Sequence, residues 1–127
     1  MAKRIGDRSP VAKPGDTANV PDSGDLIWLS FTPQAGREQA GRRPGLVLSP
    51  RAYNSKVGLC PVCPVTHHRK GYSFEVVLPD ELPVKGVVLA DHVKSAHWQE
   101  RGCDFIATVS TGVLDEVRAK LKVLLGM

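Results

Sequence analysis

DLIWLSFTPQAGREQAGRRPGLVLS, residues 25–49, contains two short apolar runs on either side of a polar stretch. The runs Asp25–Phe31 and Gly45–Ser49 are rich in the branched and aromatic residues that favour β-strands. Between them, Arg37–Pro44 brings three guanidinium groups, a carboxylate and an amide into one glycine-containing loop. Guanidinium groups bind phosphate through paired hydrogen bonds. The stretch therefore predicts two strands joined by a loop that handles phosphodiesters.

Short apolar runs separated by turn residues continue along the chain, at Val57–Thr66, Tyr72–Leu78, Gly86–Ala90 and Phe105–Val109. Such spacing is typical of a small antiparallel barrel or a strongly curved sheet. After Ser110 the apolar positions recur at intervals of three and four residues, at Leu114, Val117, Leu121 and Leu124. An amphipathic helix that ends at Gly126 is therefore expected to pack on the sheet. The predicted fold class is mainly β (α+β).

The chain has 127 residues, which is the usual size of one domain. Residues 1–23 mix Pro, Gly, Asp and Ser without periodicity, so we expect a flexible arm there and a domain at 24–127. Three cysteines, without a signal-peptide pattern, favour a cytoplasmic location. No apolar run is long enough to predict a membrane span.

The formal net charge of +4 is unevenly distributed. Residues 37–70 carry seven Lys or Arg against the single acid Glu38, whereas residues 71–127 carry six basic residues against eight acidic ones. A positive field confined to one part of a chain is expected of a polyanion site on one face. A solvated surface that happens to be rich in arginine is the alternative that charge alone leaves open.

Cys60-Pro61-Val62-Cys63 resembles a zinc or redox motif, which His67, His68 and Cys103 could complete. Positions 60 and 63 of one strand point to opposite faces, because side chains alternate along a strand. The two thiols would then not converge on one ion. We therefore predict small buried thiols, no metal and no cofactor, and we expect the two prolines of the run to mark an edge or bulged strand.

Several short motifs together resemble the MazF/PemK family of toxin endoribonucleases. They are Gly24–Trp28, Glu38–Gly41 with Arg43-Pro44, Val47–Pro50 with Tyr53-Asn54, Lys70–Tyr72 with Phe74–Val76, and Ala90-Asp91 with Val93–Ser95. Each is weak alone, but they occur in the same order over about Gly24–Gly126. The resemblance implies an SH3-like (CcdB/PemK-like) small β-barrel with a C-terminal helix. It also implies a homodimer that cuts single-stranded RNA without metal and that a cognate antitoxin inhibits.

The same resemblance assigns catalytic roles to Arg43, Thr66 and Glu38. Metal-free cleavage uses the 2′-hydroxyl as nucleophile and leaves a 2′,3′-cyclic phosphate and a 5′-hydroxyl. Guanidinium groups keep their proton below pH about 12, so Arg43 is expected to stabilise developing charge and not to act as a base. Thr66 can donate its hydroxyl hydrogen to a phosphate oxygen, although it could instead merely cap a turn. Glu38 is the preferred general base and His67 the alternative.

Further residues are expected to contact RNA. Phe31 is a candidate stacking platform for a base, and Gln39 and Arg42 are candidates for contacts with base edges or phosphates. Because His67 and His68 are adjacent, at most one is expected to face the site. Trp28 is assigned to the core or to a dimer contact. The full set of predicted RNA-binding residues is Phe31, Gln39, Arg42, His67, Lys70, Lys94 and Arg101.

The predicted function is that of a sequence-specific, metal-independent endoribonuclease toxin that inhibits translation by cutting single-stranded mRNA. A basic groove favours an acidic, flexible antitoxin segment as its inhibitor. Two other functions stay open: an SH3-like module that binds nucleic acid or protein without cutting it, and a toxin of the same fold that poisons DNA gyrase.

Overall fold

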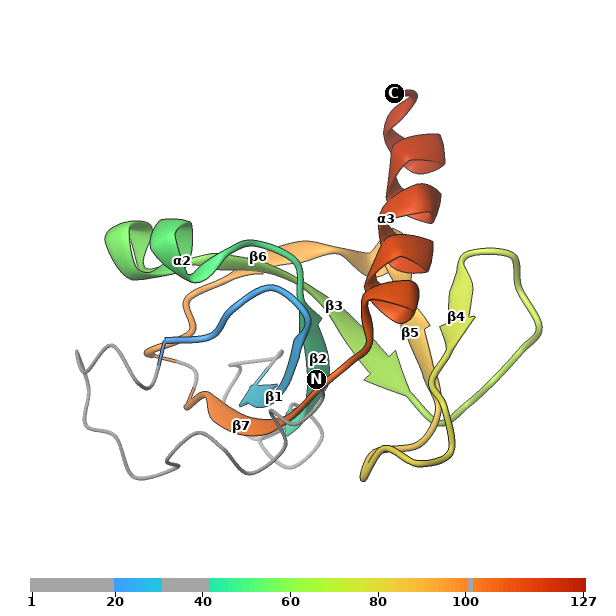
Figure 1. The fold of residues 1–127 in the computed structure, drawn as a ribbon, viewed down its shortest axis with the longest axis horizontal. Helices are drawn as coiled ribbons and strands as arrows, with labels where there is room; N and C mark the ends of the chain where they lie inside the picture. The colour runs from blue at the N-terminus through green and yellow to red at the C-terminus, as the bar shows by residue number, and fades with distance from the viewer. Residues whose placement is uncertain (1–19, 31–41, 101) are drawn as a thin grey trace.

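An antiparallel sheet forms most of the computed structural model, which describes residues 20–30, 42–100 and 102–127 (Figure 1). Along the main path the strand order is β4-β5-β3-β2-β1-β7, and β6 pairs with β3 beside β5. The strands are β1 Asp25–Ser30, β2 Arg42–Val47, β3 Cys60–Thr66, β4 Glu75–Val77, β5 Val87–Leu89, β6 Lys94–Ala96 and β7 Asp104–Thr108. Two α-helices, α2 Arg51–Val57 and α3 Thr111–Leu125, and the short 3₁₀ helix η3 Ala90–His92 complete the fold.

Both faces of the sheet are covered, so the apolar residues divide into two cores. Leu26 of β1 lies opposite Leu46 of β2, and both belong to the core that α3 covers with Val113 and Val117. The neighbouring residues Ile27 and Val47 belong instead to the second core, which Trp98 closes. The predicted mainly β fold with a C-terminal helix is therefore confirmed. Because side chains alternate along a strand and both faces of the curved sheet are covered, β1 and β2 each contribute residues to both cores.

The helix α3 follows the predicted pattern. The Ser110 hydroxyl accepts a hydrogen bond from the Val113 amide at 3.3 Å, and Gly126 ends the helix with φ of 72°. A serine at the N-cap and a glycine in the left-handed region are the ordinary start and stop of a helix. Its C-terminal half projects beyond the sheet (Figure 1), where Val123 is 73% exposed.

The helix α2 was not predicted, because its buried side is polar. Its one buried residue is Asn54, whose side-chain amide donates to the carbonyl oxygens of Pro21 at 2.8 Å and Ser49 at 2.9 Å. The Trp98 indole in turn donates to the Asn54 carbonyl at 3.0 Å. Hydrophobic periodicity cannot detect a helix that is anchored in this way. Three-residue β6 was also missed, and the predicted strands at Val57–Thr66 and Tyr72–Leu78 shorten to β3 and β4.

Residues 20–23, which the sequence placed in the arm, pack on the domain. Val20 is 2% exposed, and the Asp22 carboxylate accepts the backbone amide of Arg51 at 2.9 Å. The folded part of the chain therefore begins at or before Val20. The rest of the predicted arm, residues 1–19, lies outside the described residues.

The strand β3 carries both cysteines of the Cys60–Cys63 motif. Cys60 lies in the second core and Cys63 in the first, so the predicted opposite orientation of the two thiols is confirmed. Burial raises the pKa of each thiol to about 12, and the negative charge of Asp91 adds to the effect at Cys63. The expectation of an edge strand is wrong, because β3 pairs with β2 on one side and with β6 and β5 on the other. Pro64 is tolerated between Val62, where pairing with β6 ends, and Val65, where pairing with β5 begins.

The helices in the described ranges are all too short or too polar to span a lipid bilayer.

Candidate active site

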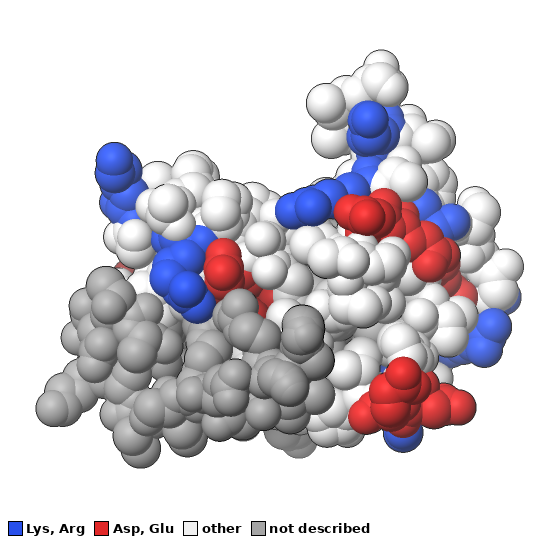
Figure 2. Space-filling view, in the orientation of Figure 1, with Lys and Arg blue, Asp and Glu red and all other residues white. Residues whose placement is uncertain are grey.

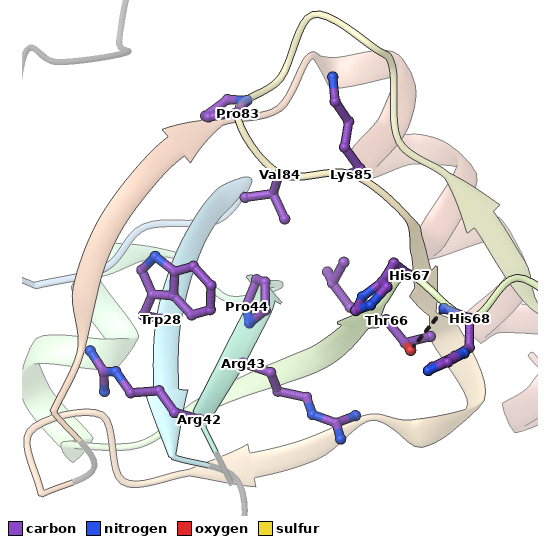
Figure 3. Close-up of a pocket in the computed structure, with 11 residues that line it drawn as sticks. Trp28, Arg42, Arg43, Pro44, Thr66, His67, His68, Pro83, Val84 and Lys85 are labelled. Atoms are coloured by element: carbon purple, nitrogen blue, oxygen red, sulfur yellow. Dashed lines mark hydrogen bonds between the residues drawn. The ribbon is translucent and has the colours of Figure 1, made fainter. Parts of the chain in front are cut away.

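A cavity of about 650 Å³ opens where β1, β2 and β3 approach the segment 83–85 (Figure 3). It is lined by Trp28, Arg42, Arg43, Pro44, Val65, Thr66, His67, His68, Pro83, Val84 and Lys85. Within the described part of the chain, its lining includes three cationic side chains and two imidazoles but no carboxylate. Such a lining favours an anionic ligand.

Arg43 and Thr66 come from neighbouring strands and meet at this cavity. Gly45 of β2 lies opposite Pro64 of β3, and moving two residues further along each antiparallel strand leads to Arg43 and Thr66. Both side chains therefore belong to the same face of the sheet, at the ends of their strands. The Arg43 side chain makes no hydrogen bond or ion pair with another described residue, and its guanidinium points toward the side of the cavity where Thr66 and His68 lie (Figure 3).

The hydroxyl of Thr66 is held by the backbone. Its oxygen accepts a hydrogen bond from the His68 amide at 3.2 Å, which leaves the hydroxyl hydrogen available for a ligand. Thr66 does cap a turn, and the same contact orients it as a donor. Gly86 fixes the strand position, because a Cβ there would lie 2.2 Å from the Thr66 carbonyl oxygen. With φ of 125°, Gly86 occupies a backbone region that only glycine adopts readily.

Arg42 and Arg43 have different surroundings although they are adjacent. Arg42 donates to the Asp104 carboxylate at 2.5 Å and to the Gly102 carbonyl oxygen at 2.9 Å. The two arginines point to opposite sides of the strand (Figure 3). The expectation that 42–44 belong to a loop is wrong, because pairing with Ser30 and Leu29 extends β2 to Arg42. This pairing gives Arg43 a strand scaffold in place of a loop.

His67 and His68 both line the cavity, so the expectation that at most one of them does is wrong. Their rings stack with centroids 5.1 Å apart and an interplanar angle of 20°. Strand alternation does not separate them, because β3 ends at Thr66. The site therefore contains two imidazoles next to the threonine hydroxyl.

Sequence reasoning missed the apolar wall of the cavity. Trp28, which was assigned to the core or a dimer contact, is 39% exposed and lies opposite Pro44 in the sheet. Val84 points toward them from the segment 83–85 (Figure 3). The position of Trp28 in an apolar run pointed to burial. Lys85, next to Val84, donates to the Asp80 carbonyl oxygen at 2.5 Å.

Comparisons with known proteins identify the family to which the chain belongs. Residues 22–125 match the model of the family described as PemK-like, MazF-like toxin of type II toxin-antitoxin system. The chain belongs to this family. It is similar to the endoribonuclease toxin MazF of Escherichia coli K12, with 51% identity over 107 residues, 84% of this chain and 96% of that protein. The resemblance noted from the sequence is thereby confirmed.

Two solved structures of MazF from Deinococcus radiodurans are also similar. One is a crystal structure of MazF, with 60% identity and a TM-score of 0.79, covering 85% of this chain and 98% of that chain. The other is a MazE-MazF crystal structure, with 58% identity, a TM-score of 0.79 and the same coverage. Nearly the whole MazF fold is therefore present in this chain.

Some predicted site residues of this family member lie elsewhere. Lys70 and Lys94 do not line the cavity. The backbone amide of Lys70 donates to the two oxygens of the Glu75 carboxylate at 3.0 and 3.2 Å. The predicted residues Phe31, Glu38, Gln39 and Arg101 lie outside the described residues. On the face shown in Figure 2, basic side chains are interspersed with acidic ones and do not form one continuous positive surface.

The described residues contain no cluster of three or more His, Cys, Asp or Glu that could hold a metal ion.

Proposed function

We propose that this chain is the toxin of a type II toxin-antitoxin pair and an endoribonuclease that cuts single-stranded mRNA at a short sequence and thereby inhibits translation. One observation carries the proposal: Arg43 and Thr66 lie on adjacent strands at one cationic cavity, in a chain 51% identical to a curated endoribonuclease toxin. Fold alone does not establish an activity, so the proposal rests on the residues at the cavity together with the similarity to that relative.

The proposed reaction needs no metal. The 2′-hydroxyl attacks the adjacent phosphorus, and the products are a 2′,3′-cyclic phosphate and a 5′-hydroxyl. Arg43 stabilises the charge that develops on the phosphate oxygens, since a preorganised cation at that position contributes several kcal/mol in catalysis. Thr66 donates its hydroxyl hydrogen to the same group, with its oxygen held by the His68 amide. Glu38, which lies outside the described residues, is the proposed general base for the 2′-hydroxyl.

The apolar wall and the cations have separate roles in RNA binding. Trp28 and Pro44 offer a flat surface for an unstacked base, since base–aromatic stacking contributes about 1–3 kcal/mol per base. Arg42 and His67 contact phosphates or base edges at the cavity, and Lys70 and Lys94 extend the RNA-binding surface outside it. Phe31, Gln39 and Arg101, which lie outside the described residues, remain predicted RNA-binding residues.

The proposed partners are a cognate antitoxin and a second copy of this chain. An acidic, flexible antitoxin segment would complement the cationic cavity, and a MazE-MazF complex is known for the relative from D. radiodurans. The exposed apolar residues near the end of α3, Leu125 at 63% and Met127 at 81%, support a homodimer. We place the protein in the cytoplasm, where mRNA is translated.

Incubation of the purified protein with a long transcript in EDTA tests the function. Discrete fragments with cyclic-phosphate and 5′-hydroxyl ends are expected. Intact RNA that is merely retarded on a native gel would instead support a binding module, and inhibition of DNA gyrase without RNA cleavage would support the gyrase-poisoning alternative.

A further inference from the structure

The stacked imidazoles of His67 and His68 are the titratable groups of the cavity that the proposed reaction leaves unused. Both rings line the cavity, and their near-parallel stacking at 5.1 Å restricts their orientation. No other imidazole lines the cavity within the described ranges. Side chains that titrate near neutral pH and lie at a reaction site are candidates for proton transfer.

The two histidines occupy different places around Thr66. The His68 amide donates to the Thr66 hydroxyl, so the backbone of His68 is tied to the residue that is proposed to bind the phosphate. Figure 3 shows the His68 ring on the side of the cavity to which the Arg43 guanidinium points. The His67 ring lies instead toward Pro44 and the apolar wall (Figure 3). His68 is therefore the imidazole on the Arg43 side.

The reaction requires a proton donor that Arg43 and Thr66 do not supply well. The 5′-oxygen leaves as an alkoxide unless it is protonated, and guanidinium and hydroxyl groups give up protons poorly near pH 7. We propose that His68 is the general acid of this chain and that it donates a ring proton to the departing 5′-oxygen. This inference rests on the proposed endoribonuclease function and adds a catalytic residue to it.

The step balances in atoms and charge. The 2′-oxygen forms a bond to phosphorus while its proton passes to the general base, and the bond between phosphorus and the 5′-oxygen breaks. The ring N–H of protonated His68 transfers its proton to that oxygen, which becomes the 5′-hydroxyl. Neutral His68 then regains a proton from water, and nothing is oxidised or reduced.

Among the described residues, the other charged or titratable groups that line the cavity with His68 are His67, Arg43, Lys85 and Arg42, the last of which is paired with Asp104. Arg69 follows His68 in the chain but does not line the cavity. A bound phosphate adds negative charge among these groups, and nearby negative charge favours a protonated imidazole. His67 acts as a positioning residue that restricts the His68 ring by stacking.

A substrate with a bridging 5′-sulfur tests the assignment directly. A thiolate leaves without needing a proton, so it removes the demand for a general acid. First, the cut site is mapped on a transcript. Single-turnover rates are then measured on an oligonucleotide that spans the site, with oxygen or sulfur as the 5′-bridging atom. We expect His68→Gln to cut the oxygen substrate about 10²- to 10³-fold more slowly than wild type, and the sulfur substrate within about threefold of wild type.

His97→Gln is the matched control, because His97 lies outside the cavity with its Nδ1 4.0 Å from Glu100. It is expected to cut both substrates at the wild-type rate. Thermal unfolding and affinity for a 2′-O-methyl oligonucleotide verify that His68→Gln still folds and binds. The proposal is overturned if His68→Gln cuts the oxygen substrate at the wild-type rate, or if it cuts both substrates equally slowly. It is also overturned if the sulfur substrate restores the cleavage rate of His67→Gln but not that of His68→Gln. A wild-type protein that cuts neither substrate overturns the proposed function as well.

Discussion

The two ends of β3 carry residues whose chemistry and surroundings point in opposite directions. In its first four residues, Cys60 and Cys63 form a motif associated with metal and redox sites, yet both thiols are fully buried in separate cores. At its end, Thr66 is a residue type that is common in strands, yet a backbone amide orients its hydroxyl at an open cationic cavity. Within one strand, burial and neighbours decide which side chain can act on a ligand.

The largest expected effect on RNA cleavage is at the cavity, where β3 ends. Arg43→Ala should lower the rate of RNA cleavage by about 10³-fold, because it removes the cation proposed to stabilise the developing charge. Single-turnover kinetics on a mapped substrate measure the loss. Arg118→Ala is the control, since Arg118 lies on α3 with its partner Asp115 at 3.9 Å. Wild-type cleavage by Arg43→Ala would exclude the catalytic assignment.

Thr66 should show a smaller effect of the same kind. Thr66→Val keeps the shape of the side chain but removes the hydroxyl, and cleavage is expected to fall about 10²-fold. Thr66→Ser keeps the hydroxyl and should retain activity within about tenfold. The same kinetic assay compares the two variants. Equal rates for Val and Ser would show that the hydroxyl has no role.

Loss of a buried thiol of β3 is expected to leave RNA cleavage unchanged. Cys63→Ala removes a side chain whose Sγ lies 3.8 Å from the Ala90 carbonyl oxygen, and it is expected to destabilise the fold by about 1 kcal/mol. Cleavage per folded molecule should be unchanged. Urea unfolding measures the first quantity and single-turnover kinetics the second. A loss of activity at full folding would give the motif a role in the reaction.

The rate at which iodoacetamide modifies each cysteine compares the three thiols in one experiment. Burial raises the pKa values of Cys60 and Cys63 to about 12, so little thiolate forms at pH 8. Cys103 is partly exposed, so iodoacetamide should modify it first. Because the folded pKa values are raised, the stability from these thiols is fully present below about pH 9 and is lost as pH rises toward 12. Peptide mapping by mass spectrometry measures which cysteine is modified first. Modification of Cys60 or Cys63 as fast as Cys103 would contradict the expected order of reaction.

The smallest effect is expected at the turn that contains Lys70. Burial tends to raise the pKa of Glu75, but hydrogen bonds from the amides of Lys70, Gly71 and Tyr72 and the nearby charge of Arg69 lower it overall. The stability from this carboxylate is therefore present above its unfolded pKa and is lost as pH falls through the folded value. Thermal unfolding of wild type and Glu75→Gln should differ slightly at pH 7 and converge at low pH. An identical difference at both values would contradict this.

Sequence patterns predicted the elements that follow hydrophobic periodicity. The strand β1 was recognised as a short apolar run of residues that favour strands, and the helix α3 was recognised because its apolar residues recur at intervals of three and four. The helix α2 was missed because a buried asparagine anchors it. At the site, the Arg-Pro motif identified Arg43 from the sequence. The exposure of Trp28 and the stacking of His68 on His67 could not be identified in this way, because they depend on where the strands end. Such tertiary features leave no periodic signal in the sequence.

A double-mutant cycle of Arg43→Ala and Thr66→Val most directly tests whether the two side chains act as one unit on the scissile phosphate. Residues that act together have strongly non-additive effects on rate. The account predicts that the double variant cuts within about threefold of Arg43→Ala alone. A double variant whose loss equals the product of the two single losses would contradict it.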